Sequence, residues 1–595
     1  MGMIFALTLL VRLIAALPIQ RPGYMDAYYY YDGAEALYRG LGFSEEFIWN
    51  YLDDPQGIPH PSHLYWPPLS SILAYLSFLV FGPSHRAAQL PFILLSATLP
   101  LITYYVSLHF VSGSGDLSES RGGDFLRGSR PIALAVLRRI TPNAVGLLPL
   151  SERTRSDERG DTPLSPRLAG NRRQAIAAAL FTTFSGFYTI YWASPDSFAP
   201  FAVTASLSLV AMALGLRGDS LWWFALSGAL AGLSHLTRAD GVLLLAVLPI
   251  AIIFKTRRAA PLFPSIPSAP SRHLRSLALA VFPVIVGYAL IVSPWFYRNW
   301  LAVSTPFPST GTQTLFLRNY DEIFSYGREL TWQHYLSWGW GPILQSKLKA
   351  IGVNLMRLVA ENMLIFLAPF IVIGLWRLRR RLEYLPFFIY APLLYLAMTL
   401  AFTFPGVRGG LFHSGGALLP FLFAAAMPGL DTAIAWIARR RSHWDVSLAQ
   451  RMFTIGFIAL AFFLSAFIYV RAVFGGQPLT PAWNQRDQVY ADIAAWLNEN
   501  APPQATVMVG NPPGFYYFSH RPAVVVPNED IGTVLQACDR YGVEFIILDQ
   551  NRPRPLREIY SGEAGHPRLL LRQTFGQAKL FEVVRTRGNS VGSSS

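Results

Sequence analysis

Acidic residues near the start of the chain are the first candidates for chemistry. Asp26, Asp32 and Glu35 lie around a run of tyrosines in the segment YMDAYYYYDGAE, directly after a short apolar stretch. A carboxylate partly desolvated by aromatic rings can act as a general base on a hydroxyl or amine. Asp26 could instead cap a helix that begins near Ala27, with the tyrosines forming an interfacial belt. Both interpretations stay open at this point.

Two further segments carry polar groups suited to a site. His63 lies in HPSHLYWPPL, which could form a pocket rim or bind a metal, or could form a stiff interfacial turn with aromatic anchors. Asp196 lies in SPDS, where it could share the role of Asp26 or cap the following helix. These residue types therefore predict acid–base chemistry and are compatible with a divalent metal.

Isolated arginines complete the set of candidates. Arg238 lies in LTRAD, Arg298 in PWFYRN and Arg408 in PGVR, shortly before His413. A charged group near a bilayer is costly unless it pairs or binds an anion. Arginine forms charge-assisted hydrogen bonds with phosphate, so carboxylates and arginines together would suit a phosphate-linked lipid substrate. Pairing with neighbouring carboxylates or with headgroup phosphates is the alternative.

The composition shows what must position these residues. Of the 595 residues, 52% are hydrophobic and only 14% are charged, whereas soluble domains carry about 25% charged residues. The chain is therefore predicted to be a membrane protein. Its single cysteine, Cys538, excludes disulfide frameworks and metal sites built from cysteines.

Apolar stretches of spanning length recur along most of the chain and predict a polytopic helical bundle. A span needs about 20 apolar residues. Pro67–Gly82 is shorter and bounded by prolines, so we predict a juxtamembrane or partly inserted helix there. Eleven spans are predicted: Met3–Pro18, Ala87–Phe110, Gln174–Ala193, Phe198–Leu216, Leu221–Leu236, Gly241–Phe254, Ser276–Ser293, Leu355–Trp376, Tyr384–Phe404, Ala417–Ile437 and Phe453–Arg471.

The basic residues assign a side to each loop. With the N-terminus in the cytoplasm, the inner loops carry 25 Lys and Arg and the outer loops carry 10, as the positive-inside rule requires. The first loop, 19–86, is then outside, and an Arg-rich insertion, 111–173, is cytoplasmic. Much of the net charge of +14 thus reflects orientation in the plasma membrane, and no nucleic-acid partner is expected.

The composition becomes typical of soluble proteins after the last span. We divide the chain into a membrane domain, 1–472, a small α/β domain, 473–586, and a disordered tail, 587–595. In the α/β domain, Gln485–Asn500 and Asp530–Tyr541 read as helices. Ala505–Val509, Ala523–Val526 and Val543–Leu548 read as strands. An odd number of spans places this domain outside the cell.

The order of these motifs resembles that of the GT-C superfamily, in particular its protein O-mannosyltransferase and aminoarabinose transferase branch. The resemblance extends over 3–471 and uses six weak motifs in matching order. They are Asp26 after the first span, Pro67-Pro68-Leu69, Asp196 in SPDS, GLSHLTR ending at Arg238, PW with Arg298-Asn299, and Arg408 with Leu418-Leu419-Pro420. Two departures are notable: Asp26 is followed by Ala27 rather than Glu, and Trp66 stands where the mannosyltransferases have His.

The resemblance implies an inverting glycosyltransferase that uses a polyprenyl-phosphate-linked sugar donor. Asp26 is then expected to be the catalytic base and Asp196 a second catalytic acid. Substrate contacts are expected from a further set, namely Asp32, His63, Arg238, Arg298, Arg408 and His413. No cofactor is required, although a divalent metal would be compatible. Membrane lipid is an expected partner, and the sequence does not identify the acceptor.

A transporter or lipid flippase is the alternative from another functional class. Such proteins place ionisable groups near the bilayer midplane. Arg12, Arg357 and Glu361 are the main candidates for that position, and the last two, spaced i,i+4, could simply pair with each other. Most other candidate residues belong to one membrane face, which favours chemistry at that surface.

Overall fold

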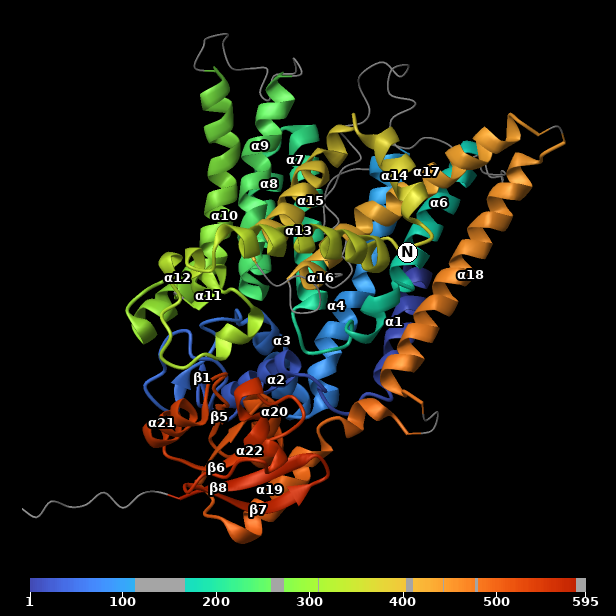
Figure 1. The fold of residues 1–595 in the computed structure, drawn as a ribbon. Helices are drawn as coiled ribbons and strands as arrows, with labels where there is room; N and C mark the ends of the chain where they lie inside the picture. Colours follow the sequence, from blue (N-terminus) through green and yellow to red (C-terminus); the bar gives the residue numbers. More distant parts are fainter. Residues whose placement is uncertain are drawn as a thin grey trace, which may run out of the picture.

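The computed structural model describes residues 1–112, 166–257, 272–308, 310–402, 410–441, 443–476 and 480–584. Arg408, most of the predicted insertion 111–173 and the predicted disordered tail 587–595 lie outside the described residues. The described chain is mainly helical, and its strands come from the first loop and from the C-terminal segment (Figure 1).

Six helices among the described residues are long and apolar enough to cross a membrane, and the protein is an integral membrane protein. Each coincides with a predicted span. They are His85–Val111 (α4 with a π-helical end), Phe198–Gly218 (α7), Leu277–Val303 (within α10, Arg272–Val303), Leu382–Ala401 (containing α15, Leu385–Leu396), Leu411–Ala438 (α16, Leu411–Gly415, and α17, Leu419–Ala438) and Val446–Val473 (α18).

The other five predicted spans correspond to shorter, less apolar or interrupted helices. Three are short: α1 (Gly2–Ala16), α8 (Leu221–Thr237) and α9 (Leu244–Arg257). The prediction of one continuous span over Gln174–Ala193 is wrong, because α6 (Pro166–Thr183) ends before Gly186, whose φ is +60°, and a 3₁₀ helix follows over Gly186–Ile190. The Ser185 hydroxyl at this break accepts a hydrogen bond from the Trp192 indole at 2.7 Å.

The predicted span Leu355–Trp376 is also broken. Helix α13 (Trp340–Arg357), which runs across the bundle in Figure 1, ends in a π-helical turn, and α14 begins only at Ala368 (Ala368–Leu378). The buried Asn362 amide donates hydrogen bonds to the Tyr188 hydroxyl at 3.0 Å and the Gly415 carbonyl at 2.8 Å. A straight apolar helix would leave that amide without partners, which is costly in a membrane interior.

Two short helices lie between the bundle and the C-terminal segment (Figure 1). Helix α2 (Met25–Tyr38) follows α1, and α3 (Leu69–Phe81) follows the proline pair exactly where a juxtamembrane helix was predicted. The buried tyrosines of α2 pack against α20 (Pro512–Ser519): the rings of Tyr28 and Tyr517 are 5.0 Å apart. The tyrosine run therefore joins two parts of the protein rather than facing lipid alone.

The C-terminal segment contributes most of a six-stranded sheet in the order β2-β5-β4-β6-β8-β7. Strands β4 (Thr506–Val509), β5 (Ala523–Val525) and β6 (Val543–Leu548) are parallel, and β7 (Leu569–Phe575) and β8 (Ala578–Val583) are antiparallel to their neighbours. The helices on this sheet are α19 (Gln488–Asn500), α20, α21 (Ile531–Tyr541) and α22 (Arg557–Ser561). The predicted helices and strands of this region lie within a few residues of these bounds.

One strand of this sheet comes from the first loop. Strand β2 (Phe47–Ile48) pairs in parallel with β5, so the loop that carries α2 is hydrogen-bonded to the C-terminal segment. A second pair, β1 (Ser44–Glu45) with β3 (His60–Pro61), folds the same loop back on itself. The sequence did not predict either pairing, because two-residue strands have no periodicity to detect.

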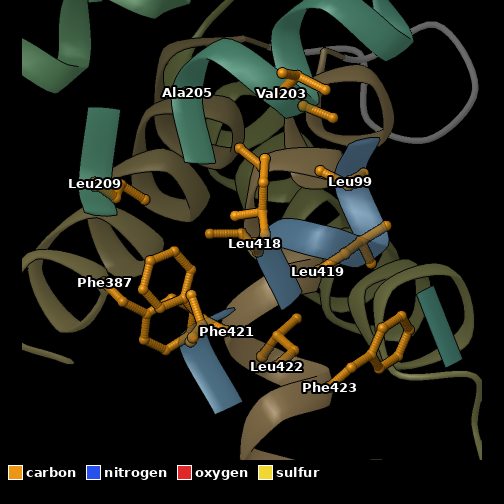
Figure 2. Close-up of a cluster of buried hydrophobic side chains, with 14 of the residues drawn as sticks. Leu99, Val203, Ala205, Leu209, Phe387, Leu418, Leu419, Phe421, Leu422 and Phe423 are labelled. Atoms are coloured by element: carbon orange, nitrogen blue, oxygen red, sulfur yellow. The ribbon is translucent and has the colours of Figure 1, made fainter. Parts of the chain in front are cut away.

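A continuous apolar core lies inside the bundle. Figure 2 shows part of it, where Phe387 of α15 stacks on Phe421 of α17 beside Leu418 and Leu422. The two rings are 5.4 Å apart and inclined by 19°. Aromatic pairs of this kind add to the stabilisation from buried area. The core fixes α17, which continues from the short helix carrying His413.

Close helix packing in the bundle depends on glycines. A Cβ atom at Gly429 of α17 would lie 1.8 Å from the Phe370 carbonyl oxygen of α14, and one at Gly374 would lie 1.8 Å from the Ala425 carbonyl oxygen. Small residues allow membrane helices to approach this closely. The pair Gly374 and Gly429 therefore sets the distance between α14 and α17.

Replacing Gly429 by Ala should destabilise the bundle by about 1–3 kcal/mol, because the added methyl group forces α14 and α17 apart. The melting temperature in detergent measures the effect, with aggregation of the unfolded protein as the signal that reports unfolding. Gly352→Ala in α13 is the matched control, since a Cβ atom there would meet nothing within 4 Å. Equal melting temperatures of the two variants would contradict this packing role.

Candidate active site

A cavity of about 1070 Å³ lies between the helical bundle and the C-terminal sheet. The first loop contributes Asp26, Tyr65 and Trp66, and the bundle contributes Arg238 and His413. Residues of the loops after β4, β5 and β6 line its other part. The cavity therefore brings polar groups from distant parts of the sequence to one space.

Two carboxylates and an imidazole meet at the bundle end of this cavity. Asp26 lies in the first turn of α2, Asp196 lies just before α7, and His413 lies in α16. One potential ligand atom of each lies within 4.8 Å of the other two. His413 Nδ1 is 3.9 Å from Asp196 Oδ2 and 3.1 Å from the Ser197 hydroxyl. The predicted pair of acids is thus assembled together with the predicted His413.

The environment of the acids favours proton transfer near neutral pH. Burial and the nearby charge of Asp196 raise the pKa of Asp26 to about 7, although Arg238 acts in the opposite direction. Burial also raises the pKa of Asp196, which accepts a hydrogen bond from the Tyr24 hydroxyl at 2.8 Å. A carboxylate with a pKa close to the working pH is well suited to act as a general base.

Arg238 faces the acids from the end of α8. Its Nε donates to Asp240 Oδ1 and to the Ser414 hydroxyl, each at 3.1 Å. Burial alone would lower the pKa of Arg238, but the charges of Asp240 and Asp196 outweigh this and raise it. Among the described residues, its Nη2 has no hydrogen-bond partner, although Nη1 reaches the Ser197 hydroxyl at 3.5 Å. The guanidinium is held in place with one amino group available to an anion.

The donor set fits a divalent metal. Asp26 and Asp196 offer carboxylate oxygens and His413 offers an imidazole nitrogen, a combination that zinc or manganese accepts. From the sequence, the histidines of the HPSH segment, His60 and His63, were possible metal ligands. In the structure it is His413 that lies beside the two acids. Three protein ligands beside a large cavity would leave coordination positions open.

The arrangement of helices matches solved membrane proteins. ArnT from Cupriavidus metallidurans in the apo state aligns with a TM-score of 0.52 at 13% identity, over 98% of this chain and 97% of that one. ArnT bound to undecaprenyl phosphate gives 0.50 at 13% identity over the same shares. The archaeal oligosaccharyltransferase AglB from Archaeoglobus fulgidus, in complex with an inhibitory peptide and a dolichol-phosphate, gives 0.52 at 12% identity, over 92% of this chain and 69% of that one.

ArnT and AglB are GT-C glycosyltransferases. The chain has the GT-C fold. The resemblance predicted from the order of six motifs is therefore confirmed. No protein-family model matches the sequence, and a comparison with curated proteins finds no similar sequence. At such low identity the similarity establishes the GT-C fold, and the chemistry has to be argued from the residues.

Asp32 and His63 do not line the cavity that contains Asp26 and Arg238. The geometry therefore does not support their predicted role in substrate binding. Asp32 is six residues after Asp26, which turns its side chain about 240° around α2. It is only 3% exposed, and its carboxylate oxygens have no hydrogen-bond partner among the residues that the structure describes. His63 is buried between the hydroxyls of Ser62 and Ser71, at 2.7 and 2.9 Å. Both residues line a separate space of about 10 Å³.

Arg298 also lies outside the cavity, so its predicted phosphate contact is not supported by the geometry. Its Nη2 donates to the Phe43 carbonyl at 2.5 Å, and its guanidinium stacks on Phe43 and Trp295. It therefore ties the end of α10 to the first loop. The predicted ion pair of Arg357 with Glu361 is present. Arg408 lies outside the described residues.

The sequence missed several groups that shape the site. Tyr24 and Ser197 hold Asp196 and His413, and Ser414 links Arg238 to Asp240. Tyr24, Ser197 and Ser414 each lie one or two residues from a predicted site residue. This proximity in the sequence is the signal that could have indicated them. Hydroxyl residues are common in helices and loops, so their types alone are not informative.

Metal binding is expected to depend on the acids. Asp196→Asn should weaken binding of Mn²⁺ or Zn²⁺ at least tenfold, as removal of a ligand from a three-residue set requires. Because Asp26 must lose its proton to bind a metal, affinity should fall as the pH drops below its pKa of about 7. Isothermal titration of the metal-stripped protein tests both effects, with His60→Gln as control. Unchanged affinity of Asp196→Asn would contradict this assignment.

His60 is expected to make stability depend on pH. Its Nε2 is 2.9 Å from Asp53 and its Nδ1 is 3.2 Å from Glu45. Burial opposes its charge, but these hydrogen bonds and charges prevail and raise the pKa of His60 to about 9. An unfolded histidine has a pKa of about 6.5. The stabilisation should be complete below about pH 6.5 and lost as the pH rises through 9.

The measurement is the melting temperature from pH 6 to pH 10, for the wild type and for His60→Gln. The difference between the two should shrink across this range, because the variant has no titrating group at this position. A constant difference would show that His60 is neutral in the folded protein.

Proposed function

We propose that the protein is an inverting glycosyltransferase that moves a sugar from a polyprenyl-phosphate-linked donor to an acceptor at the extracytoplasmic face of the membrane. The observation that carries the proposal is the meeting of Asp26, Asp196 and His413 beside the guanidinium of Arg238, at the end of a cavity of about 1070 Å³. A base and a phosphate-binding cation at one cavity are the two groups that this reaction needs.

Asp26 takes the proton of the acceptor hydroxyl. As that proton moves to the carboxylate, the hydroxyl oxygen forms a bond to C1 of the sugar, and the bond from C1 to the phosphate oxygen breaks. The electron pair stays with the departing lipid phosphate, and attack from the opposite side inverts C1. The pKa of Asp26, about 7, makes it an effective proton acceptor at neutral pH.

Arg238 binds the departing phosphate. Negative charge grows on the phosphate as the bond to C1 breaks, and a fixed guanidinium stabilises that charge without rearrangement. Asp196 orients the acceptor or shares the role of base. His413, held by Ser197 at 3.1 Å, lies at the same point. Arg298, stacked on Trp295 outside the cavity, is left out of this role.

A divalent ion held by Asp26, Asp196 and His413 would place positive charge beside the lipid phosphate when bound. The sugar and the acceptor of the reaction are not identified by these groups.

The orientation of the protein also belongs to this proposal. Eleven spans with a cytoplasmic N-terminus would place the first loop, the cavity and the C-terminal α/β domain outside the cell. The inner loops would then hold most of the basic residues. A donor whose lipid tail stays in the bilayer can reach a cavity at that face laterally. Solved structures of similar fold hold undecaprenyl phosphate or dolichol-phosphate, which supports a lipid phosphate donor.

Proteoliposomes distinguish this function from transport. The purified protein receives undecaprenyl-phosphate carrying a tritiated hexose or pentose, together with an envelope extract as acceptor. If the protein transfers the sugar, the tritium should appear in a product that survives mild acid, a treatment that cleaves the sugar–phosphate bond of the donor. Labelled donor that changes leaflet but is recovered unaltered would contradict transfer and support a flippase.

A further inference from the structure

The C-terminal sheet presents one particular edge to the cavity. Strands β5, β4 and β6 are adjacent and parallel, so their carboxyl ends lie along the same edge. Gly510 directly follows β4, Val526 and Asn528 follow β5, and Asn551 follows β6; all of them line the cavity. In open α/β sheets, ligands bind outside the carboxyl ends of the parallel strands. The sheet thus offers its binding edge to the space that contains Asp26.

Two arginines lie at this edge. Arg552 and Arg554, in the loop after β6, both line the cavity. The Arg552 guanidinium stacks 3.9 Å from the centre of the Tyr560 ring, and its Nη1 is tied to the Asp549 carbonyl at 3.3 Å. Its Nε is buried and has no hydrogen-bond partner in the described part of the chain. Arg552 is therefore oriented by its neighbours but keeps hydrogen-bonding capacity.

Arg554 is exposed and, among the described residues, makes no ion pair or hydrogen bond with its side chain. Asp321, in the 3₁₀ turn Tyr320–Phe324, also lines the cavity, and its main-chain carbonyl accepts a hydrogen bond from Asn528 at 3.4 Å. Neither arginine forms an ion pair with it. At the bundle end, by contrast, Arg238 is paired with Asp240 at 3.1 Å.

The two ends of the cavity thus differ in charge. The bundle end combines Arg238 with three carboxylates, those of Asp26, Asp196 and Asp240. At the sheet end, Arg552 and Arg554 form no ion pair among the described residues, although the Asp549 carboxylate interacts electrostatically with Arg552. Guanidinium groups form their strongest hydrogen bonds with carboxylate and phosphate oxygens. A molecule that spans the cavity would meet the reaction centre at one end and a site for an oxyanion at the other.

We propose that the carboxyl edge of β5-β4-β6 is the acceptor subsite of the cavity, and that Arg552 and Arg554 select an acceptor carrying an oxyanion group, phosphate or carboxylate, remote from the hydroxyl that receives the sugar. This inference depends on the proposed glycosyltransfer. In this proposal the C-terminal segment determines which acceptor binds. Asp26 and Arg238 carry out the transfer itself, which is the same for every acceptor.

The test measures binding of three synthetic glycosides to the full-length protein in nanodiscs. Decyl glucoside is neutral, decyl glucuronide carries a carboxylate, and decyl 6-phosphoglucoside carries a phosphate. At least one anionic probe should bind about tenfold more tightly than the neutral one at low salt, and high salt should reduce the difference. The stronger of the two anionic probes identifies the oxyanion.

Variants assign the preference to the two arginines. Arg554→Gln should reduce the preference, and Arg552→Gln/Arg554→Gln should remove it, while affinity for the neutral glucoside stays the same. Arg557→Gln is the matched control, because Arg557 is exposed on α22 a few residues away and does not line the cavity. Arg554 is exposed and makes no side-chain hydrogen bond or ion pair among the described residues, so its single variant keeps the test valid if the double variant unfolds.

Equal binding of neutral and anionic glycosides by the wild type would overturn the subsite, as would a double variant that keeps the preference. The proposed function has a separate readout, the labelled donor assay with Asp26→Asn. If Asp26→Asn abolishes transfer while the arginine variants change no affinity, only the acceptor subsite is wrong. If Asp26→Asn transfers normally, the proposed chemistry fails whatever the arginines do.

Discussion

Replacing Asp26 by Asn should lower sugar transfer by about 10²–10⁴-fold, because the amide cannot accept the proton of the acceptor hydroxyl. The fold should remain intact. Asp26 lies beside the cavity, and a neutral amide relieves its repulsion with Asp196, which contributes to raising its pKa. Initial rates with the tritiated donor, together with melting temperatures in detergent, measure the two effects separately.

Asp32→Asn is the matched control in the same helix. Burial raises the pKa of Asp32 well above its usual range and so favours the uncharged carboxyl, which an amide of nearly the same shape replaces at little cost. Transfer by this variant should stay within about twofold of the wild type, since Asp32 does not line the cavity. Full activity of Asp26→Asn, or equal losses in both variants, would contradict the assignment of Asp26 as the base.

Arg238→Gln is expected to have the second largest effect. Loss of a fixed positive group beside the departing phosphate should reduce turnover by about 10²–10³-fold. Arg238→Lys keeps the charge but not the planar donor geometry that contacts Asp240 and Ser414, so it should retain an intermediate rate. Single-turnover measurements with saturating donor give these rates directly.

A double variant separates the catalytic role from the structural one. Removing Arg238 alone leaves the largely buried Asp240 carboxylate, whose side chain is 12% exposed, without its ion-pair partner and should cost about 3 kcal/mol of stability. In Arg238→Gln/Asp240→Asn neither charge remains, so the melting temperature should recover while turnover stays low. If turnover recovers together with stability, Arg238 only supports the fold and another group binds the phosphate.

Several parts of this protein follow from its sequence. The low charge and the recurring apolar stretches indicated a membrane protein, and the short helix predicted at Pro67–Gly82 is present as α3. The alternating patterns after the last span predicted α19, α21 and the strands β4 to β6. These features are local: each depends on the polarity, the length or the boundary residues of one segment, which the sequence states directly.

The two broken spans show where local reasoning fails. Leu355–Trp376 and Gln174–Ala193 are apolar enough on average to read as helices. The breaks are fixed by hydrogen bonds to distant segments: the Asn362 amide donates to the Gly415 carbonyl, and the Gly186 backbone N–H donates to the Ser465 hydroxyl of α18. Neither segment alone indicates these partners.

The tertiary structure alone decided the composition of the site. Asp26, Asp196, Arg238 and His413 were all candidates, but so were Asp32, His63 and Arg298, and the sequence could not separate the two groups. Membrane helices that are apolar on nearly all sides do not specify their neighbours by hydrophobic pattern, since lipid and protein offer similar surroundings. Close contacts at Gly429 and pairings such as β2 with β5 select the neighbours instead. Those contacts bring distant loops together, and the active-site cavity exists only where they meet.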